Sequence, residues 1–415
     1  MYVYTPLNHD KKTIRLLWPE FSGDAASPIR GCLREFELES APPFKALSYT
    51  WGDPEPTYEI LIRNGETEYQ KFSVRQNLHQ FLMMKTGGME SYLWIDQICI
   101  NQANVHERNH QVQQMADIYK SAQAALCWLG PGFPDSDKVM ADLGNTAEID
   151  RVMTLSKKEF KRQRLPFLRS LREAFRTFFA VPYFSRIWIM QEVLLSRHRI
   201  MILGNDTLDW GPSHASESTQ GQSFDWVMAN FQGVDKVFPR YEIMPFLMLD
   251  GKMSIDNSHG ITWTWVRALD FSVSAECVEP RDRFFALLGL VCEACRIPVD
   301  YSMDLVDIIR SMLLKEIEFE SCGKKASLED FLHILRTGIE CRDRFKLEAA
   351  LTDKQLRNFV ADNAVAIVQA MEPHRPNLRF TTFRALFFTL ARAHQLSDFR
   401  FLKGAEYSKG FRKAI

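Results

Sequence analysis

The chain has 415 residues, and at roughly 150 residues per domain it has room for two or three domains. Hydrophobic residues make up 46% of it and charged residues 25%, which is typical of a globular protein and excludes a largely disordered chain. Its 51 Lys and Arg residues balance 52 Asp and Glu residues, so the overall charge gives no reason to expect a nucleic acid as partner.

No run of apolar residues approaches the ~20 that a membrane-spanning helix needs, because charged side chains interrupt the longest one, at 175–195. Residues 1–10 contain no apolar core of the kind that directs secretion. The 8 cysteines are too dilute for a disulfide-based fold. We therefore expect a cytoplasmic protein with no membrane span.

The N-terminal part of the chain is rich in predicted strands. Residues 13–18 partly alternate between apolar and polar side chains, and residues 29–38 repeat this pattern weakly. Residues 46–51 form a short run typical of a buried strand, and a Gly-Asp-Pro turn follows them. Residues 59–63 and 71–74 predict a hairpin around an Asn-Gly turn.

Helix and strand patterns then alternate as far as Gly130. We expect, in chain order, a helix over 78–85 capped by Asn77, a strand over 92–100, a helix that follows Asn104 and a strand over 124–129. Asn104 and Glu107 have the spacing of a capping box, in which the two side chains satisfy backbone N–H groups at the start of a helix. The alternation is typical of a parallel α/β sheet.

The remaining sequence is predicted to be mainly helical. The expected elements are a basic helix over 157–176, a helix over 184–195, a strand over 200–203, an exposed linker over 212–223, and helices over 283–290 and 305–319. The basic block at 157–176 fits a solvated helix face. The alternatives are a targeting signal, a surface for anionic lipid or a self-association surface.

The familiar catalytic and metal-binding motifs are absent from the sequence. It contains no phosphate-binding loop, no HExxH, no GxSxG and no GxGxxG. Cys292 and Cys295 form a CxxC pair with Cys277 upstream, but the candidate for a fourth zinc ligand, His259, is distant. We therefore expect no metal site.

Three longer segments share the order and spacing of known motifs. They are ALSYTWGD at 46–53, LWIDQICINQ at 93–102 and RIWIMQE at 186–192. Together they resemble the heterokaryon incompatibility (HET) domain of filamentous fungi. PRDRFFALLGL at 280–290 is similar to a segment that often follows this domain, and the resemblance covers roughly residues 2–310.

The resemblance implies a protein of fungal non-self recognition, a form of innate immunity, in which HET domains promote programmed cell death. HET domains are also similar to TIR domains, which self-associate and in several lineages hydrolyse NAD+. In this chain the TIR-like features are the Ser48-Tyr49 pair, Ile95-Asp96 at the end of the second core strand, and the spacing from Trp188 to Glu192.

The fold class that we expect is α/β. It comprises a TIR-like, flavodoxin-like parallel sheet with flanking helices and a strand-rich N-terminal lead-in, followed by a mainly α-helical C-terminal region. The expected domain boundaries are 1–40 for the strand-rich extension, 41–211 for the HET domain, 212–260 for a linker and irregular segment, and 261–415 for the mainly helical region.

The resemblance to TIR domains implies that Glu192 is a catalytic carboxylate. Loops that follow parallel strands meet at one edge of a doubly wound sheet, where ligands bind. The residues that we expect to line the pocket there are Trp51, Gly52, Asp53, Asp96 and Trp188. NAD+ is the candidate substrate, because a carboxylate can stabilise the positive charge that forms on a ribose, as in glycoside hydrolysis. No cofactor or metal is required, because nicotinamide is a good leaving group.

Each of these residues also has a structural explanation. Glu192 can form a buried salt bridge with Arg186, Asp96 can cap a loop, and Glu107 can cap a helix. Four tryptophans fit a hydrophobic core as well as a stacking platform: Trp51, Trp94, Trp128 and Trp188. The chain is therefore either a candidate NAD+ glycohydrolase or a non-enzymatic adaptor, and a degenerate homologue is a third alternative. In both main cases we expect self-association and an unidentified incompatibility partner protein.

Overall fold

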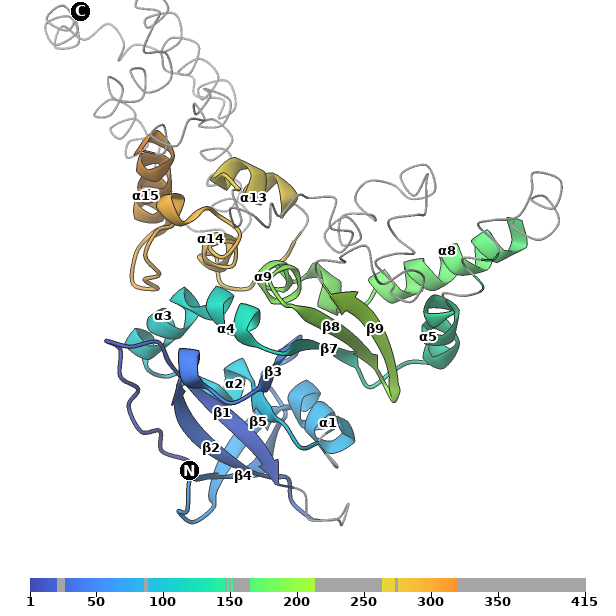
Figure 1. Cartoon of the computed structure of the whole chain (residues 1–415), viewed down its shortest axis with the longest axis horizontal. Helices are drawn as coiled ribbons and strands as arrows, with labels where there is room; N and C mark the ends of the chain where they lie inside the picture. Colours follow the sequence, from blue (N-terminus) through green and yellow to red (C-terminus); the bar gives the residue numbers. More distant parts are fainter. Residues whose placement is uncertain are drawn as a thin grey trace, which may run out of the picture. The chain divides into compact units, whose positions relative to one another are not determined.

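Figure 1 shows a computed structural model of the chain, which describes residues 1–20, 27–85, 89–145, 148, 151, 165–212, 263–272 and 275–318. The chain divides into two compact units, Met1–Ser302 and Met303–Ile415. Helix α15 (Leu305–Glu318) belongs to the second unit and matches the helix predicted over 305–319. The predicted linker at 212–223 and most of the basic block at 157–176 lie outside the described residues.

The first unit contains a sheet of nine strands in the order β5-β4-β2-β1-β6-β3-β7-β8-β9. The strands are β1 (Thr13–Glu20), β2 (Arg30–Glu37), β3 (Phe44–Tyr49), β4 (Thr57–Asn64), β5 (Gln70–Arg75), β6 (Tyr92–Trp94), β7 (Ala124–Gly130), β8 (His198–Leu203) and β9 (Asp206–Pro212). Strands β6, β3, β7 and β8 run parallel to one another. The expectation of a parallel sheet is wrong for the sheet as a whole, because β1 pairs antiparallel with β2 and β6, and β5 and β9 are antiparallel edge strands.

The burial of the strands follows their place in the sheet. Every residue of β7 is buried, and all but one residue of β3. Apolar residues dominate both strands, because a parallel strand covered by helices on two faces has no solvent side. Strand β5 lies at an edge, and only Val74 of its residues is buried. Strands β1 and β2, from the predicted N-terminal extension, pair along their whole length within this same sheet.

Helices cover both faces of the central strands (Figure 1). The helices and 3-10 turns in the described residues of this unit are η1 (Leu38–Ser40), α1 (Gln76–Lys85), α2 (Asp96–Cys99), α3 (Val105–Gln113), α4 (Met115–Ser121), α5 (Ser136–Gly144), α8 (Leu165–Phe179), η3 (Pro182–Ser185), α9 (Ile189–Leu194), α13 (Trp265–Phe271), α14 (Asp282–Phe285) and η4 (Glu293–Cys295). Helix α1 lies on one face, where the indole of Trp128 packs edge-on to Phe81. Helices α3, α4 and α9 lie on the other, where Trp94 packs against Tyr119 of α4.

The strand order creates a reversal between β3 and β7. The chain moves from β3 to β6 on one side, and then crosses back to β7 on the other side of β3. This is the order of the first strands of a flavodoxin-like sheet, in which ligands bind beyond the carboxyl ends of the strands at the reversal. In this chain those ends are the residues that follow Tyr49 and Gly130.

Several predicted elements are confirmed with changed boundaries. The hairpin forms between β4 and β5, and Gly65 in its turn has the positive φ of 56° that glycine adopts without strain. Helix α1 starts at Gln76, so Asn77 lies inside it and does not cap it. The Asn77 side chain donates to Thr50 O (2.6 Å) and accepts from Trp128 Nε1 (2.8 Å).

Three predicted elements are shorter than the sequence pattern suggests. The strand over 92–100 ends at Trp94, because Ile95 O accepts the backbone N–H groups of Ile98 and Cys99 and starts the short helix α2. The helix over 184–195 is divided into η3 and α9, because the chain between them forms a β-bridge to Glu276. The helix over 283–290 ends early, since α14 stops at Phe285.

The segment after residue 275 is fixed to α9 by one buried amide. The side chain of Gln191 donates through Nε2 to Phe285 O (3.0 Å) and accepts the backbone N–H of Gly289 at Oε1 (3.1 Å). A Cβ atom at Gly289 would lie 2.4 Å from Gln191 Oε1 and 2.6 Å from the Cβ atom of Ala116. The backbone of α4 fixes the second atom, so the close approach requires glycine.

We therefore expect Gly289→Ala to lower the free energy of unfolding by about 1–3 kcal/mol, the usual cost of overpacking a filled site. Thermal unfolding measured by circular dichroism checks this. Gly144→Ala in α5 is the matched control, because its Cβ would meet only Leu208 Cδ1, at an ordinary 3.6 Å. Equal melting temperatures for Gly289→Ala and the wild type would contradict the packing described for this segment.

Candidate functional site

The first part of the site lies at the carboxyl ends of β3 and β6. Trp51 follows β3 and donates from Nε1 to Oδ2 of Asp96, the first residue of α2, at 2.7 Å. The guanidinium of Arg75 lies 4.9 Å from the centre of the Trp51 ring and donates to Gly52 O at 2.9 Å. Gly52 has a φ of 70°, a conformation that strains other residues. Trp51, Gly52 and Asp96 therefore lie together, and the ligand pocket that the sequence places there stays a prediction.

The second part of the site is built on α9. Glu192 is only 2% exposed, and its carboxylate binds the two terminal nitrogens of Arg186 at 3.1 and 3.2 Å. The hydroxyl of Ser48 on β3 donates to the same carboxylate. Tyr183 OH lies 2.6 Å from Ser48 Oγ. Because the Ser48 hydroxyl proton is used in the bond to Glu192, Tyr183 is the donor of this second bond. The structural alternative for Glu192, a buried salt bridge with Arg186, is therefore the observed arrangement.

The two carboxyl groups, of Asp96 and Glu192, influence each other. Burial, and after it the negative charge of Glu192, raise the pKa of Asp96 from 3.8 to about 6. The hydrogen bond from Trp51 and the positive charge of Arg186 oppose this shift. Asp96 is partly exposed, so the site combines a buried, ion-paired carboxylate with a more accessible one that exchanges a proton near neutral pH.

Trp188 and Asp53, two other predicted site residues, lie apart from this cluster of contacts. Trp188 Nε1 donates to Asp282 Oδ2 at 3.0 Å, and Tyr301 OH donates to the other oxygen of Asp282 at 2.6 Å. Burial raises the pKa of Asp282 to about 6. Asp53 is exposed on the loop after β3. Trp188 and Glu192 are joined through their backbone, since Glu192 N donates to Trp188 O at 3.2 Å.

The four tryptophans weighed in the sequence divide into two pairs. Trp94 and Trp128 are fully buried between the sheet and its helices, so they belong to the core. Trp51 and Trp188 are partly exposed, and each donates its indole N–H to a carboxylate with a raised pKa. An indole that presents one face to solvent can stack on a planar ligand.

The sequence analysis marked Ser48 only as part of a TIR-like pair with Tyr49, and it missed Tyr183 and Arg75 as residues of the site. Ser48 is a buried polar residue inside an apolar strand, and that mismatch is a signal which identifies it. Tyr183 lies six residues upstream of Ile189, outside the motif, and nothing in the sequence marks it as a partner of Ser48. Arg75 ends β5, an edge strand, and reaches Trp51 only because the sheet brings β5 and α1 beside the β3 loop.

Within the described ranges, no three His, Cys, Asp or Glu side chains are placed to hold a metal ion. Cys292 and Cys295 are buried, and His259 lies outside the described residues. The described helices also include none that is long and apolar enough to cross a membrane.

The raised pKa of Asp96 predicts a stability change with pH. Between pH 3.8 and about 6 the folded chain holds the Asp96 proton more tightly than the unfolded chain does, so stability falls as pH rises through this window. We expect Asp96→Asn, which keeps an acceptor for Trp51, to raise the free energy of unfolding by about 1–2 kcal/mol at pH 7.5 and by nothing at pH 4. Urea unfolding at the two pH values measures the difference.

The exposed Asp53→Asn is the matched control for this prediction, and we expect it to match the wild type at both pH values. A lower stability of Asp96→Asn than of the wild type at pH 7.5 would show that the ionised Asp96 carboxylate stabilises the fold, contrary to the pKa direction.

Comparisons with known proteins agree with the motifs that build this site. Residues 44–192 match the family model described as "Heterokaryon incompatibility protein (HET)", so the matched region runs from the first residue of β3 to Glu192. The chain is 28% identical over 208 residues to "Heterokaryon incompatibility protein 6, OR allele" of Neurospora crassa, which covers 42% of this chain and 30% of that protein. The chain thus spans about a third of the length of the curated relative it matches. No solved structure matches the chain.

The matched region includes all three motif segments, at 46–53, 93–102 and 186–192, and these provide both carboxylates of the site. Residues 44–192 of the chain are therefore similar to a HET domain.

Proposed function

We propose that the chain acts in fungal heterokaryon incompatibility, as an effector that promotes cell death by hydrolysing NAD+ in a self-associated state. The HET match and the name of the Neurospora crassa relative support the biological role. One observation supports the chemistry more than any other. Two carboxyl groups that interact electrostatically, Asp96 and Glu192, lie with Trp51 at the strand ends where a sheet of this order binds ligands.

The proposed reaction breaks the bond between ribose C1′ and the nicotinamide nitrogen. The electron pair of that bond leaves with nicotinamide, and positive charge develops on the ribose, where the Glu192 carboxylate stabilises it. A water oxygen forms the new bond to C1′, and Asp96 in its ionised form accepts the water proton. The products are nicotinamide, ADP-ribose and one proton. Trp51 provides an aromatic face for a planar part of the substrate.

For this reaction the ribose of the substrate must be able to reach the Glu192 carboxylate. In the described structure Arg186 and Ser48 occupy its carboxylate, and the backbone next to Arg186 is bonded to Glu276. Self-association is the step that we expect to move Arg186 away from the carboxylate. The monomer is inactive in this proposal.

Nicotinamide release by the purified full-length chain at high concentration tests the proposal. We expect Glu192→Gln to lower the rate by about 100-fold or more, a typical cost of removing charge stabilisation at a transition state. The matched control is Glu173→Gln on α8, because Glu173 is 69% exposed and pairs only at the surface with Arg176. Equal rates for Glu192→Gln and the wild type would remove the catalytic role.

Asp96→Asn provides a second variant, because Glu192→Gln also disturbs a buried ion pair. The wild-type rate is expected to rise with pH through about 6, as Asp96 loses its proton and becomes the base. We expect Asp96→Asn to lack this rise and to release nicotinamide at least about 10-fold more slowly at pH 7.5. If Asp96→Asn is slower than the wild type and also more stable, unfolding cannot explain the loss of rate. A pH profile of Asp96→Asn that matches the wild type would contradict the role of Asp96 as the base.

A second candidate function is that of a non-enzymatic adaptor, which acts through self-association and recruitment of a partner protein. The specific observation in its favour is the closed state of Glu192, whose carboxylate is fully satisfied by Arg186 and Ser48. Expression in a fungal host, scored for growth arrest, separates the two candidates. Arrest by the Asp96→Asn variant with unchanged cellular NAD+ would establish the adaptor, and loss of both arrest and NAD+ depletion would support the enzyme.

A further inference from the structure

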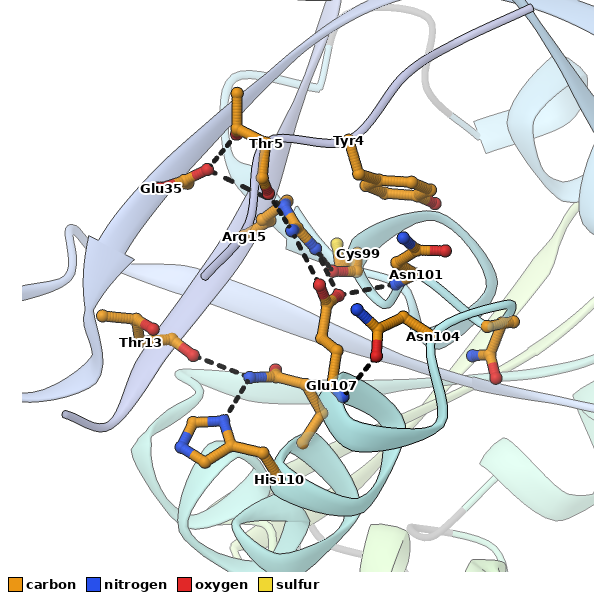
Figure 2. A network of polar contacts seen from close by, with 12 residues as sticks. Tyr4, Thr5, Thr13, Arg15, Glu35, Cys99, Asn101, Asn104, Glu107 and His110 are labelled. Atoms are coloured by element: carbon orange, nitrogen blue, oxygen red, sulfur yellow. Dashed lines mark hydrogen bonds and ion pairs between the residues drawn. The ribbon is translucent and has the colours of Figure 1, made fainter. Parts of the chain in front are cut away.

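A second buried ion pair lies away from the carboxylates of the site (Figure 2). It joins Arg15 on β1 to Glu107 on α3, and each residue is 1% exposed. The pair is bidentate, with Nη1 to Oε1 at 2.6 Å and Nη2 to Oε2 at 3.0 Å. Glu107 was predicted to close a capping box. That prediction is wrong for its side chain, since Asn104 accepts the first N–H groups of α3 and the Glu107 carboxylate turns to Arg15.

Two further hydrogen bonds of this pair go to one loop. We define the Asp96 loop as residues 95–102, from the end of β6 to the turn before α3. Arg15 Nη1 donates to Cys99 O at 3.0 Å, and Glu107 Oε1 accepts from Asn101 N at 2.7 Å. Figure 2 shows both side chains directed at the backbone of this loop.

The N-terminal segment, residues 2–5, contacts both Arg15 and the Asp96 loop. The ring of Tyr4 lies 4.7 Å from the Arg15 guanidinium, and its hydroxyl donates to Ile98 O in the Asp96 loop at 2.9 Å. Thr5 O accepts from Arg15 Nη2. Tyr2 N donates to Lys71 O of β5, so the segment is fixed to the sheet on one side and to the loop on the other.

Stability of the fold alone does not require an ion pair at this place. Two charges that leave water lose hydration, and a well-packed apolar pair of similar volume is often as stable. Their distinctive result is that three positions of the Asp96 loop, Ile98, Cys99 and Asn101, are each held by a side chain from elsewhere. Asp96 begins the same loop, and its carbonyl oxygen accepts from Gln102 at the other end at 3.0 Å. Holding the loop therefore holds the Asp96 carboxyl against Trp51.

We infer that Arg15, Glu107 and Tyr4 are positioning residues, which hold the Asp96 loop in the geometry that the candidate site uses. The inference rests on the proposed function for its catalytic consequence, and on the loop geometry alone for its structural consequence. The N-terminal segment, which precedes the matched HET region, thereby contributes to the site inside it.

The test replaces the ion pair by apolar residues in the full-length chain, as Arg15→Met with Glu107→Leu. Hydrogen–deuterium exchange measured by mass spectrometry is the readout. We expect exchange in peptides covering 95–102 to accelerate by about 10-fold or more, while peptides from β3 and β7 keep their protection. The control carries the same substitutions in an exposed pair, Lys11→Met with Glu37→Leu, and is expected to exchange like the wild type.

Tyr4→Phe is the milder variant, because it keeps the ion pair and removes only the hydrogen bond to Ile98. We expect a smaller acceleration of exchange, confined to the same peptides. Unchanged exchange at 95–102 in both variants would overturn the inference. A uniform acceleration over the whole sheet would overturn it too, because it would mean that the pair serves general stability.

Nicotinamide release provides the second readout. We expect the apolar double variant to lose about 10-fold or more in kcat and to lose the rise in rate near pH 6, since a displaced base no longer serves the reaction. An inactive wild type would refute the proposed NAD+ hydrolysis and leave the exchange result to decide the positioning role. An active wild type with an equally active double variant would refute the positioning role alone.

Discussion

The ion pair between Arg186 and Glu192 joins three parts of the molecule that are distant in sequence. Glu192 stands on α9 and accepts from Ser48 on β3, while Arg186 lies in the segment bonded to Glu276. A buried carboxylate is costly unless a cation and hydrogen-bond donors surround it, and here all of them are present. This one charge therefore links α9 to β3 and to the segment that is bonded to Glu276.

The second carboxyl group, that of Asp96, is compensated only in part, since its pKa stays raised. Asp96 has an indole and a backbone N–H as donors, and the charge of Glu192 acts against its ionisation. A carboxyl group kept at a cost to stability indicates function, because folding alone would favour an amide or an apolar residue there. In our inference, Arg15, Glu107 and Tyr4 hold the Asp96 loop, and with it the Asp96 carboxyl group, in place. The site thus consists of one carboxylate in a buried ion pair, Glu192, and one carboxyl group held by hydrogen bonds, Asp96.

The sequence was sufficient for the local pattern and insufficient for long-range pairing. The runs at 46–51 and 124–129 predicted buried strands, because two covered faces demand continuous apolar residues. The pairing of β1 with β6 could not be predicted, since alternation in residues 13–18 indicates a strand and not its neighbour. Asp96 and Trp51 could be placed together from the strand-end rule, whereas Arg75 and Tyr183 depend on contacts that no spacing encodes. Glu107 has the spacing of a capping box, and only the buried charge of Arg15 explains its different role.

The proposed NAD+ hydrolysis depends on self-association, which is expected to make the Glu192 carboxylate accessible to the substrate. The most direct measurement is the specific rate of nicotinamide release from NAD+ as a function of the concentration of the wild-type chain. If assembly moves Arg186 and opens Glu192, the rate per molecule increases with concentration and reaches a plateau once the chains are associated. No release from NAD+ at any concentration, in a sample shown by light scattering to be self-associated, would contradict the account.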